Sequence, residues 1–294
     1  MSKQRFAELF LLVTTLIWGS TFVVVKGALA SCSPLAFIGF RFLLAALILS
    51  IAFYPKIKSL TRAAMIRGSV LGILLYIGFA TQTIGLRTTT ASKSAFFTGT
   101  LVVFTPIFQF LIERRIPKLG NLLGVILAAV GLYFLTSPKG SEFNVGDFLT
   151  LVCAMLFGLY IVYLDVVSVD SDRFHLTYVQ IVVTGVLGVV IALAFEQIEV
   201  NYSAGFIGSV LYLTIFATII TTWVQTRFQG DTSPTRAAVI FTLEPVIAAT
   251  FAYFVRGETL GTIGIIGGVV IVIGLLVSEF SDQLPILNRS FSLE

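Results

Sequence analysis

Two charged side chains stand inside long uncharged stretches of the sequence. Glu244 interrupts the stretch 237–255, and Arg41 joins the uncharged stretches 27–40 and 42–55. A charged group in a hydrocarbon environment costs about 2.5 kcal/mol or more unless it is paired or faces water. Residues of this kind can bind a charged end of a small molecule, and a carboxylate can also carry a proton.

A structural role is also open for these two charges, and it is the favoured interpretation for Arg41. Arg41 and Glu244 can neutralise each other across two helices, or bind backbone dipoles and hold the helices together. Pairing and contact with a substrate or a proton are therefore competing hypotheses at this point.

Aromatic and small polar residues accompany the two charges at helical spacing. Trp18 shares a helix face with Thr21, and Trp223 shares one with Phe216 and Ile219. Apolar walls with a few polar groups are typical of a cavity for a small ligand, although the same aromatics also serve in helix packing. The residues predicted to line the cavity are Trp18, Thr21, Arg41, Tyr76, Phe79, Gln82, Thr98, Tyr160, Tyr163, Gln180, Trp223 and Glu244.

Two prolines fall inside expected helices. Pro106 and Pro245 lack the N–H group that a helix interior uses, so they free the carbonyls of Val102 and Phe241. We predict either a hinge at each proline, one for each mouth of the cavity, or a static kink that widens the cavity.

The reactive side chains exclude several function classes. One His and two Cys are too few nitrogen and sulfur ligands for a structural zinc site, and His175 has no partners for a catalytic triad. The sequence has no phosphate-binding loop of the Walker type. We therefore expect no metal, no cofactor and no ATPase subunit.

The elements that must position these side chains are membrane helices. Of the 294 residues 57% are apolar and 12% are charged, whereas about 25% of an average soluble domain is charged. Most of the chain must therefore contact lipid, at roughly 20 residues per span. We expect ten helices, at residues 6–28, 34–53, 65–86, 91–112, 118–136, 146–167, 174–195, 204–226, 234–255 and 260–280.

Lys and Arg residues set the expected orientation, because cytoplasmic loops are enriched in them. With ten spans both termini lie on one side, and most of the 19 basic residues lie there too, including those of the loops 56–64 and 113–118. Lys139 belongs to the other side. We predict that both termini are cytoplasmic, and that the net charge of +4 reflects topology rather than nucleic-acid binding.

The sequence also repeats itself. Residues 68–71 and 208–211 are both Gly-Ser-Val-Leu, and further matches keep nearly the same offset. A repeat with an odd number of helices enters the membrane inverted the second time, and inverted repeats around a central cavity are typical of secondary transporters. The expected fold is all-α, with two inverted five-helix repeats at residues 1–140 and 141–281 and a cytoplasmic tail at 282–294.

Several short motifs resemble one known family. They are Trp18-Gly19-Ser20-Thr21-Phe22, the run SPTRAA at 233–238, and Leu243-Glu244-Pro245-Val246 followed by Gly257-Glu258. With the duplication, they resemble the EamA-type transporters of the drug/metabolite transporter superfamily. The resemblance implies a ten-helix, basket-like fold with a central cavity, a bacterial inner-membrane location and export of amino acids or related metabolites. In the first half Thr105-Pro106 stands where the second half has Glu244-Pro245, so a carboxylate role has no counterpart there.

The expected function is secondary transport of a small neutral or zwitterionic metabolite across the lipid bilayer by alternating access, with a proton as candidate coupling ion. A multidrug or lipophilic-cation exporter is the alternative, but the first helix offers only Glu8, at its entrance. An integral membrane enzyme would need clustered acidic or His residues, and the group Asp165, Asp170 and Asp172 is better explained as a solvated loop. A fixed channel fits the inverted repeat less well.

Overall fold

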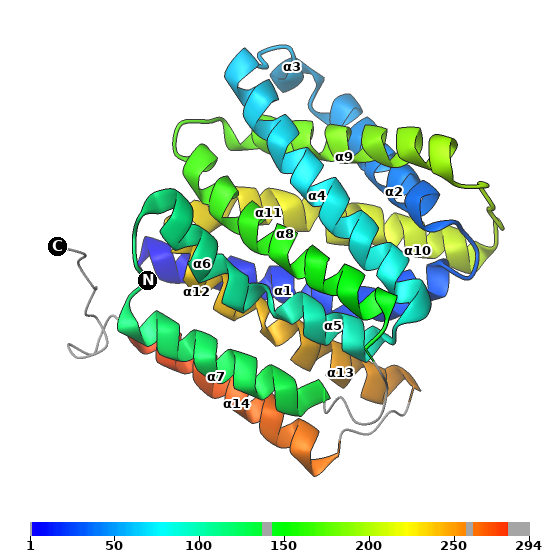
Figure 1. The fold of residues 1–294 in the computed structure, drawn as a ribbon. Coiled ribbons are helices and arrows are strands. Elements are labelled where there is room, and N and C mark those ends of the chain that lie inside the picture. The colour runs from blue at the N-terminus through cyan, green and yellow to red at the C-terminus, as the bar shows by residue number, and fades with distance from the viewer. Residues whose placement is uncertain (1, 137–142, 257–260, 282–294) are drawn as a thin grey trace.

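The computed structural model describes residues 2–136, 143–256 and 261–281, which form a bundle of helices (Figure 1). No strand occurs within these ranges, where a single bridge pairs Cys32 with Val200. Lys139, Gly257-Glu258 and the expected tail 282–294 lie outside the described residues. The helices are α1 (Lys3–Ala28), α2 (Pro34–Ala52), α3 (Tyr54–Ile57), α4 (Arg62–Thr88), α5 (Ala91–Gly99), α6 (Leu101–Glu113), α7 (Leu119–Thr136), α8 (Val145–Ser168), α9 (Arg173–Phe195), α10 (Ala204–Thr214), the π-helix η1 (Ile215–Ile220), α11 (Thr221–Phe228), the 3₁₀-helix η2 (Gln229–Asp231), α12 (Pro234–Phe241), α13 (Leu243–Arg256) and α14 (Thr262–Phe280).

Eight helical stretches in the described part of the chain are long and apolar enough to cross a membrane. This is the pattern of a multi-pass membrane protein. The other two expected spans fall on shorter helices. The span expected at 118–136 corresponds to α7, and the span expected at 234–255 corresponds to α12 and α13 together.

Helix starts follow signals that are present in the sequence. Pro34 and Pro234 occupy the first turns of α2 and α12, where their missing N–H has no intrahelical partner in any case. Asn144 and Asp147 form a capping box at the start of α8, in which each side chain accepts a hydrogen bond from the backbone N–H of the other.

Two of the expected spans are broken at a threonine. Thr100 separates α5 from α6, and Thr242 separates α12 from α13. The two residues adopt nearly the same conformation, with φ −64° and ψ −6° at Thr100 and φ −68° and ψ −8° at Thr242. Each hydroxyl donates to the carbonyl three residues earlier, those of Phe97 and Val239, which closes the end of the preceding helix.

The threonine breaks differ from the predicted positions of the bends. Pro106 lies inside the continuous helix α6, six residues after the break, and Pro245 lies in the first turn of α13. The first N–H groups of a helix have no intrahelical acceptor, so Pro245 interrupts no hydrogen bond there. The chain therefore breaks at Thr100 and Thr242 rather than at the prolines.

Glycines bring α7 and α14 into contact at one edge of the bundle (Figure 1). A Cβ atom added to Gly131 would lie 2.7 Å from the carbonyl oxygen of Gly267, and one added to Gly124 would lie 2.9 Å from that of Gly274. Gly124 thus meets Gly274, and Gly131, further along α7, meets Gly267, which comes earlier in α14. The two helices are therefore antiparallel.

The helices α2 and α9 form a second close pair at the opposite edge (Figure 1). A Cβ atom added to Gly188 would lie 2.7 Å from the backbone nitrogen of Gly39, and one added to Gly185 would lie 2.8 Å from that of Leu43. The order of these contacts makes α2 and α9 antiparallel as well.

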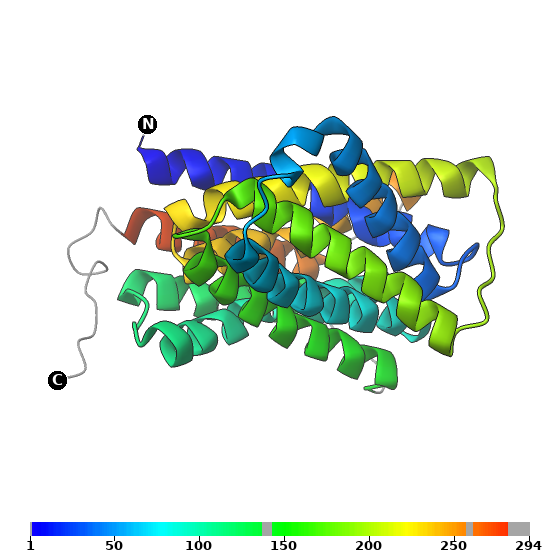
Figure 2. The ribbon, with the colours of Figure 1, turned by 90° about the horizontal axis from the view of Figure 1, so that it is seen from above.

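The first residues of α1 and the last residues of α14 lie at the same end of the bundle, which we call the terminal end (Figures 1 and 2). At the other end, the carboxylate of Glu196 caps the start of α2 by accepting hydrogen bonds from the backbone N–H groups of Leu35 and Ala36. The start of α2 thus lies at the end of the bundle opposite to the start of α1 (Figure 1).

Candidate functional site

A cavity lies in the interior of the bundle between helices from the two halves of the chain. Its wall combines aromatic and aliphatic side chains with a few polar groups and two charges. The residues that line it are Trp18, Thr21, Arg41, Leu75, Phe79, Gln82, Thr98, Leu101, Phe157, Tyr160, Ile161, Ala217, Thr222, Gln225, Phe241 and Glu244. Apolar walls with convergent polar groups are the usual composition of a small-molecule site.

Arg41 is buried and held by the opposite half of the chain. Its Nε donates to the hydroxyl of Thr218 over 2.6 Å, and its Nη2 donates to the carbonyl of Ala217 over 2.7 Å. The guanidinium carbon also lies over two aromatic rings, 5.3 Å from the centroid of Phe42 and 5.2 Å from that of Phe79. No ion pair of Arg41 occurs among the described residues, and the two hydrogen bonds use two of its five donors, which leaves donors for a ligand.

Glu244 is the second charged residue of the cavity wall. It stands in the first turn of α13, two residues after the break at Thr242. A carboxylate near a helix N-terminus is stabilised by the partial positive charge of the free N–H groups. Among the described residues Glu244 has no ion pair, and in particular none with Arg41. The predicted alternative of mutual pairing is therefore not what the structure contains.

Other polar groups of the wall are fixed by hydrogen bonds behind it. Gln82 donates from Nε2 to the hydroxyl of Thr98 over 3.0 Å, which joins α4 to α5. The hydroxyl of Tyr160 donates to Oε1 of Gln180 over 2.7 Å, and Nε2 of Gln180 donates to Thr226 over 3.0 Å. Tyr160 faces the cavity, while fully buried Gln180 holds it in place from behind.

Eight of the twelve predicted lining residues do line the cavity, namely Trp18, Thr21, Arg41, Phe79, Gln82, Thr98, Tyr160 and Glu244. Tyr76, Tyr163 and Gln180 lie outside the wall and pack against the core or, in the case of Gln180, behind Tyr160. Trp18 packs against Phe241 across the cavity wall, with ring centroids 5.3 Å apart.

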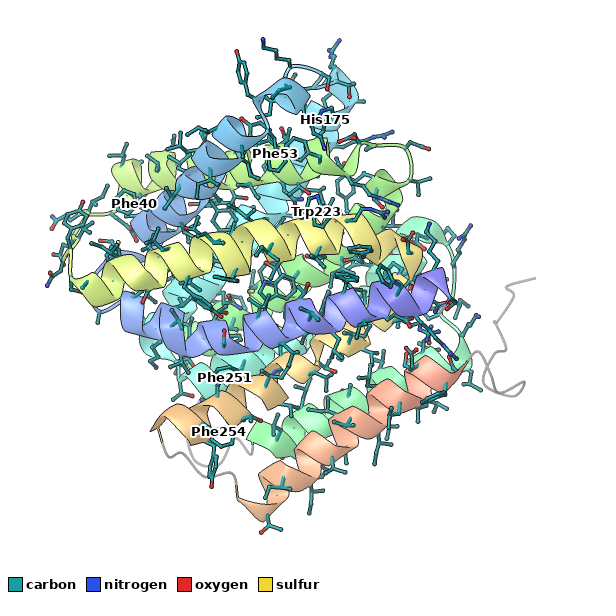
Figure 3. The ribbon with its side chains drawn as sticks, turned by 180° about the vertical axis from the view of Figure 1, so that it is seen from behind. Phe40, Phe53, His175, Trp223, Phe251 and Phe254 are labelled. Atoms are coloured by element: carbon teal, nitrogen blue, oxygen red, sulfur yellow. The ribbon has the colours of Figure 1, made fainter. Side chains whose placement is uncertain are left out.

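Trp223 does not lie in the wall of this cavity. Its side chain is 42% exposed on the outer surface of the bundle, near Phe228 (Figure 3). Phe216, predicted on the same face, is 45% exposed. An aromatic ring is as stable against lipid as in a cavity wall. The aromatic residues of η1 and α11 therefore do not indicate which side of these helices faces the cavity.

The sequence contains a better signal for this helix. Buried hydroxyl and amide side chains recur at helical spacing along α10, η1, α11 and the start of η2, and they cannot face lipid without a loss of hydrogen bonds. This polar stripe consists of Thr214, Thr218, Thr221, Thr222, Gln225, Thr226 and Gln229. Thr222 and Gln225 from this stripe line the cavity, and Phe157 and Phe241 complete the aromatic wall.

Comparison with known families gives one match, which occurs twice along the chain. The model of the EamA-like transporter family matches residues 5–137 and again residues 144–280. The two matched segments cover most of the chain and correspond to its two expected halves.

Individual relatives are described as transporters. A protein of Archaeoglobus fulgidus described as an uncharacterized transporter is 35% identical over 275 residues, which cover 94% of this chain and 86% of the relative. A probable amino-acid metabolite efflux pump of Salmonella typhimurium is 27% identical over 298 residues, which cover 93% of this chain and 94% of that protein. One crystal structure is similar with a TM-score of 0.79 at 14% identity, over 95% of this chain and 98% of its own; this likeness concerns the fold.

Proposed function

Because the chain belongs to the EamA-like transporter family, we propose that it is a secondary transporter that exports small zwitterionic metabolites, such as amino acids, by alternating access. Transport by a multi-pass membrane protein is the part that follows from the family. The substrate class, the direction and the mechanism are the proposal.

The observation that carries the substrate class is the pair of unmatched charges in the cavity. Arg41 and Glu244 line the same wall, come from different halves of the chain and form no ion pair in the described structure. An α-amino acid has a carboxylate and an ammonium group, and these two groups complement a fixed guanidinium and a free carboxylate. The aromatic wall between them suits an apolar side chain.

The same two charges argue against the alternative of a lipophilic-cation exporter. Glu244 alone would favour a cation, but Arg41 is buried in the same wall and would repel it. A zwitterion satisfies both residues, whereas a cation satisfies one and opposes the other.

Three features support two inverted five-helix repeats with ten spans. The helices α2 and α9, expected to be equivalent, pack antiparallel, and so do the expected equivalents α7 and α14. The breaks at Thr100 and Thr242 share one backbone conformation. The family model matches each half separately. We propose that the terminal end is cytoplasmic, because most of the 19 Lys and Arg residues are expected on that side.

The direction of transport rests on relatives. Two of them, from Salmonella typhimurium and Escherichia coli, are named probable amino-acid metabolite efflux pumps, which favours export across the inner membrane of a bacterial cell. In this proposal the cavity loads from the cytoplasm and releases its substrate outside.

Counterflow in proteoliposomes tests the substrate class. Liposomes with the purified protein are preloaded with one unlabelled amino acid, and entry of the same labelled amino acid is followed, with and without a pH gradient. Competition by an amino-acid amide, which lacks the carboxylate, and by the corresponding acid without the amine tests each charge. We expect competition only by zwitterions. Equal competition by the amide, or transport of a lipophilic cation instead, would contradict the proposal.

A further inference from the structure

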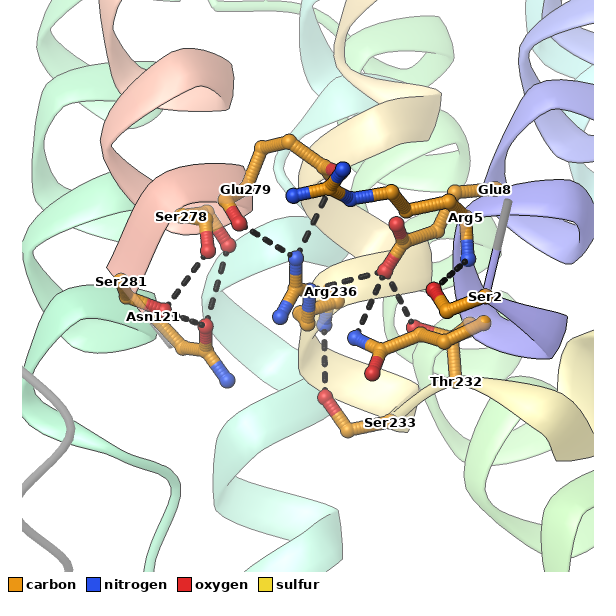
Figure 4. Close-up of polar contacts among 11 residues, drawn as sticks. Ser2, Arg5, Glu8, Asn121, Thr232, Ser233, Arg236, Ser278, Glu279 and Ser281 are labelled. Atoms are coloured by element: carbon orange, nitrogen blue, oxygen red, sulfur yellow. Dashed lines mark hydrogen bonds and ion pairs between the residues drawn. The ribbon is translucent and has the colours of Figure 1, made fainter. Parts of the chain in front are cut away.

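A buried cluster of charges ties three helices together at the terminal end (Figure 4). Arg236 of α12 donates from Nε to Oε1 of Glu8 in α1 over 2.9 Å. Its Nη2 donates to Glu279 of α14, to the carbonyl oxygen over 2.8 Å and to Oε2 over 3.1 Å. The side chains of Glu8 and Arg236 are each 6% exposed. The cluster therefore joins the first half of the chain to the second.

The hydrogen bonds of Glu8 are distributed unevenly over its two oxygens. Oε1 accepts from Gln4 over 3.0 Å, from Thr232 over 3.0 Å and from Arg236 over 2.9 Å. Oε2 is buried and has no hydrogen-bond partner among the described residues. The carboxyl group of Glu279 lies close by, because it binds the same guanidinium through Nη2 that Glu8 binds through Nε. Two ionised carboxylates are both acceptors, so a bond between them requires a proton on one of them.

The charge balance of the cluster points the same way. Two carboxylates and one guanidinium carry a net charge of −1, which is costly where Glu8 and Arg236 are shielded from water. Among the described residues, Arg236 is the cation that forms ion pairs with Glu8 and Glu279, while Arg114, Arg115 and Lys118 line the hollow that Arg236 borders. Arg5 is exposed beside the cluster, and Asp231 binds Lys3 over 2.8 Å and lies 3.7 Å from Arg227 and 3.8 Å from Arg173. Within the described helices that pack on α1, the remaining acidic residue, Glu244, lies in the cavity.

We propose that Glu8 and Glu279 form a proton-binding site in which they share one proton beside Arg236. The proton binds to Oε2 of Glu8, and the resulting hydroxyl donates to Glu279, which keeps its charge and its bond to Arg236. The cluster becomes neutral, and every oxygen of Glu8 then has a partner.

The position of the site links the proton to closure of the terminal end. Arg236 borders a wide polar hollow at this end, which Gln4 and Asp231 also line. Thr235, the neighbour of Arg236 in α12, donates from its hydroxyl to Oε1 of Gln109 in α6 over 2.6 Å. This hydrogen bond is a second link between α12 and another helix near the hollow. Loss of the proton leaves two facing carboxylates with one guanidinium, and their repulsion separates α1 from α14. Closure of this end therefore takes up a proton, and opening releases it. The physiological use of this step rests on the proposed transport function.

Infrared spectroscopy of the purified protein tests the site without any substrate. We expect a carbonyl band of a protonated carboxyl group that shifts in D₂O and disappears as the pH rises. This band should be lost in Glu8→Gln and equally in Glu279→Gln, since either change removes the shared proton. Glu199→Gln, which neutralises an exposed carboxylate, should retain it. If the difference spectra of both cluster variants show only the loss of ionised carboxylate bands at every pH, the proton site does not exist.

Cysteine labelling tests the link to closure. Thr235→Cys places a thiol at a position that is buried in this structure, and its reaction with a membrane-impermeant maleimide reports opening. At each pH the labelling rate of Thr235→Cys is divided by that of the double variant Thr235→Cys/Glu8→Gln. This ratio removes the pH dependence of the thiol–maleimide reaction itself. The ratio should rise with pH by up to about tenfold per unit, the limit for one linked proton. A ratio independent of pH would overturn the link. Neither experiment depends on transport. Both results can therefore be interpreted even if the counterflow assay shows that the protein does not transport amino acids.

Discussion

The guanidinium of Arg41 is held by Thr218, whose hydroxyl accepts a hydrogen bond of 2.6 Å from Nε. That hydroxyl in turn donates over 2.9 Å to the carbonyl of Leu213, five residues earlier, across the start of the π-helix η1. π-helical turns are rare and occur frequently at functional sites. A local irregularity in one helix thus positions a cation that another helix carries.

Removal of the Thr218 hydroxyl should weaken substrate binding. Thr218→Val leaves Arg41 with the Ala217 carbonyl alone, and a hydrogen bond to a charged group contributes about 1.5–3 kcal/mol. We expect the KM for a zwitterionic substrate to rise about tenfold or more in proteoliposome uptake. Thr250→Val is the matched control, because the Thr250 hydroxyl bonds only within its own helix on an exposed face. Equal KM values for the two variants would contradict this role of Thr218.

The two tryptophans should respond differently to substitution. Trp18 lines the cavity and packs against Phe241, whereas Trp223 is 42% exposed on the outer surface. We expect Trp18→Ala to reduce initial uptake rates strongly at equal expression, and Trp223→Ala to leave them near the wild-type rate. A loss of transport in Trp223→Ala with normal expression would place the substrate path elsewhere.

Much of the cavity was predictable, because membrane helices expose few polar residues without a reason. Arg41 and Glu244 interrupt uncharged runs, and both line the cavity. Trp223 misled the prediction, since aromatic rings are equally stable against lipid, whereas Thr222 and Gln225 of the polar stripe line the cavity. Glu8 was predicted merely as a residue at the entrance of the first helix. Its partner Arg236, which also binds Glu279, is more than 200 residues away in sequence, and no local pattern reveals that contact.

The sequence indicated that two helices are irregular, but it did not indicate where they break. The prolines indicated irregular helices, and the breaks occur three and six residues before them, at Thr242 and Thr100. A threonine can close a helix end with its own hydroxyl, as both do here. Single-sequence patterns do not distinguish such a threonine from one inside a helix.

Close packing of α7 on α14 should make Gly267 sensitive to a single methyl group. A Cβ atom there would lie 2.2 Å from the backbone nitrogen of Leu135 and 2.6 Å from the carbonyl oxygen of Gly131. Backbone atoms cannot move aside locally, so we expect Gly267→Ala to lower the free energy of unfolding by about 1–3 kcal/mol. Gly268→Ala is the control, because its Cβ would meet side chains at ordinary distances of 3.7 and 3.8 Å. Thermal unfolding of the two variants in one detergent should therefore give different midpoints, and equal midpoints would refute the close contact.

Membrane orientation can be read from two exposed positions. Lys58, at the loop after α3, is expected on the cytoplasmic side, and Tyr202, which is 73% exposed before α10, on the outer side. We expect an impermeant maleimide to label Tyr202→Cys in intact cells and Lys58→Cys only after permeabilisation. The native thiols add little background, because Cys153 is buried and burial with the nearby charge of Glu196 raises the pKa of Cys32 to about 11. The reverse labelling pattern would invert the proposed orientation.

Glu244 and Arg41 should contribute independently to stability and jointly to transport. Arg41→Gln removes two hydrogen bonds of a buried cation, so it should lower both the melting temperature and the uptake of zwitterions. Glu244→Gln breaks no ion pair in the described structure, so it should reduce uptake about tenfold or more while leaving the melting temperature close to that of the wild type. Glu199→Gln serves as the control for neutralising an exposed carboxylate.

The double variant separates this arrangement from a structural ion pair. If the two residues neutralised each other, each single substitution would strand a buried charge, and the double substitution would restore much of the lost stability. We expect no such restoration, because Arg41 is satisfied by Thr218 and Ala217 rather than by Glu244. Melting temperatures and uptake rates measured on all three variants decide the point. A double variant that melts closer to the wild type than Arg41→Gln does would mean that the two charges pair, and that a zwitterion cannot bind between them as proposed.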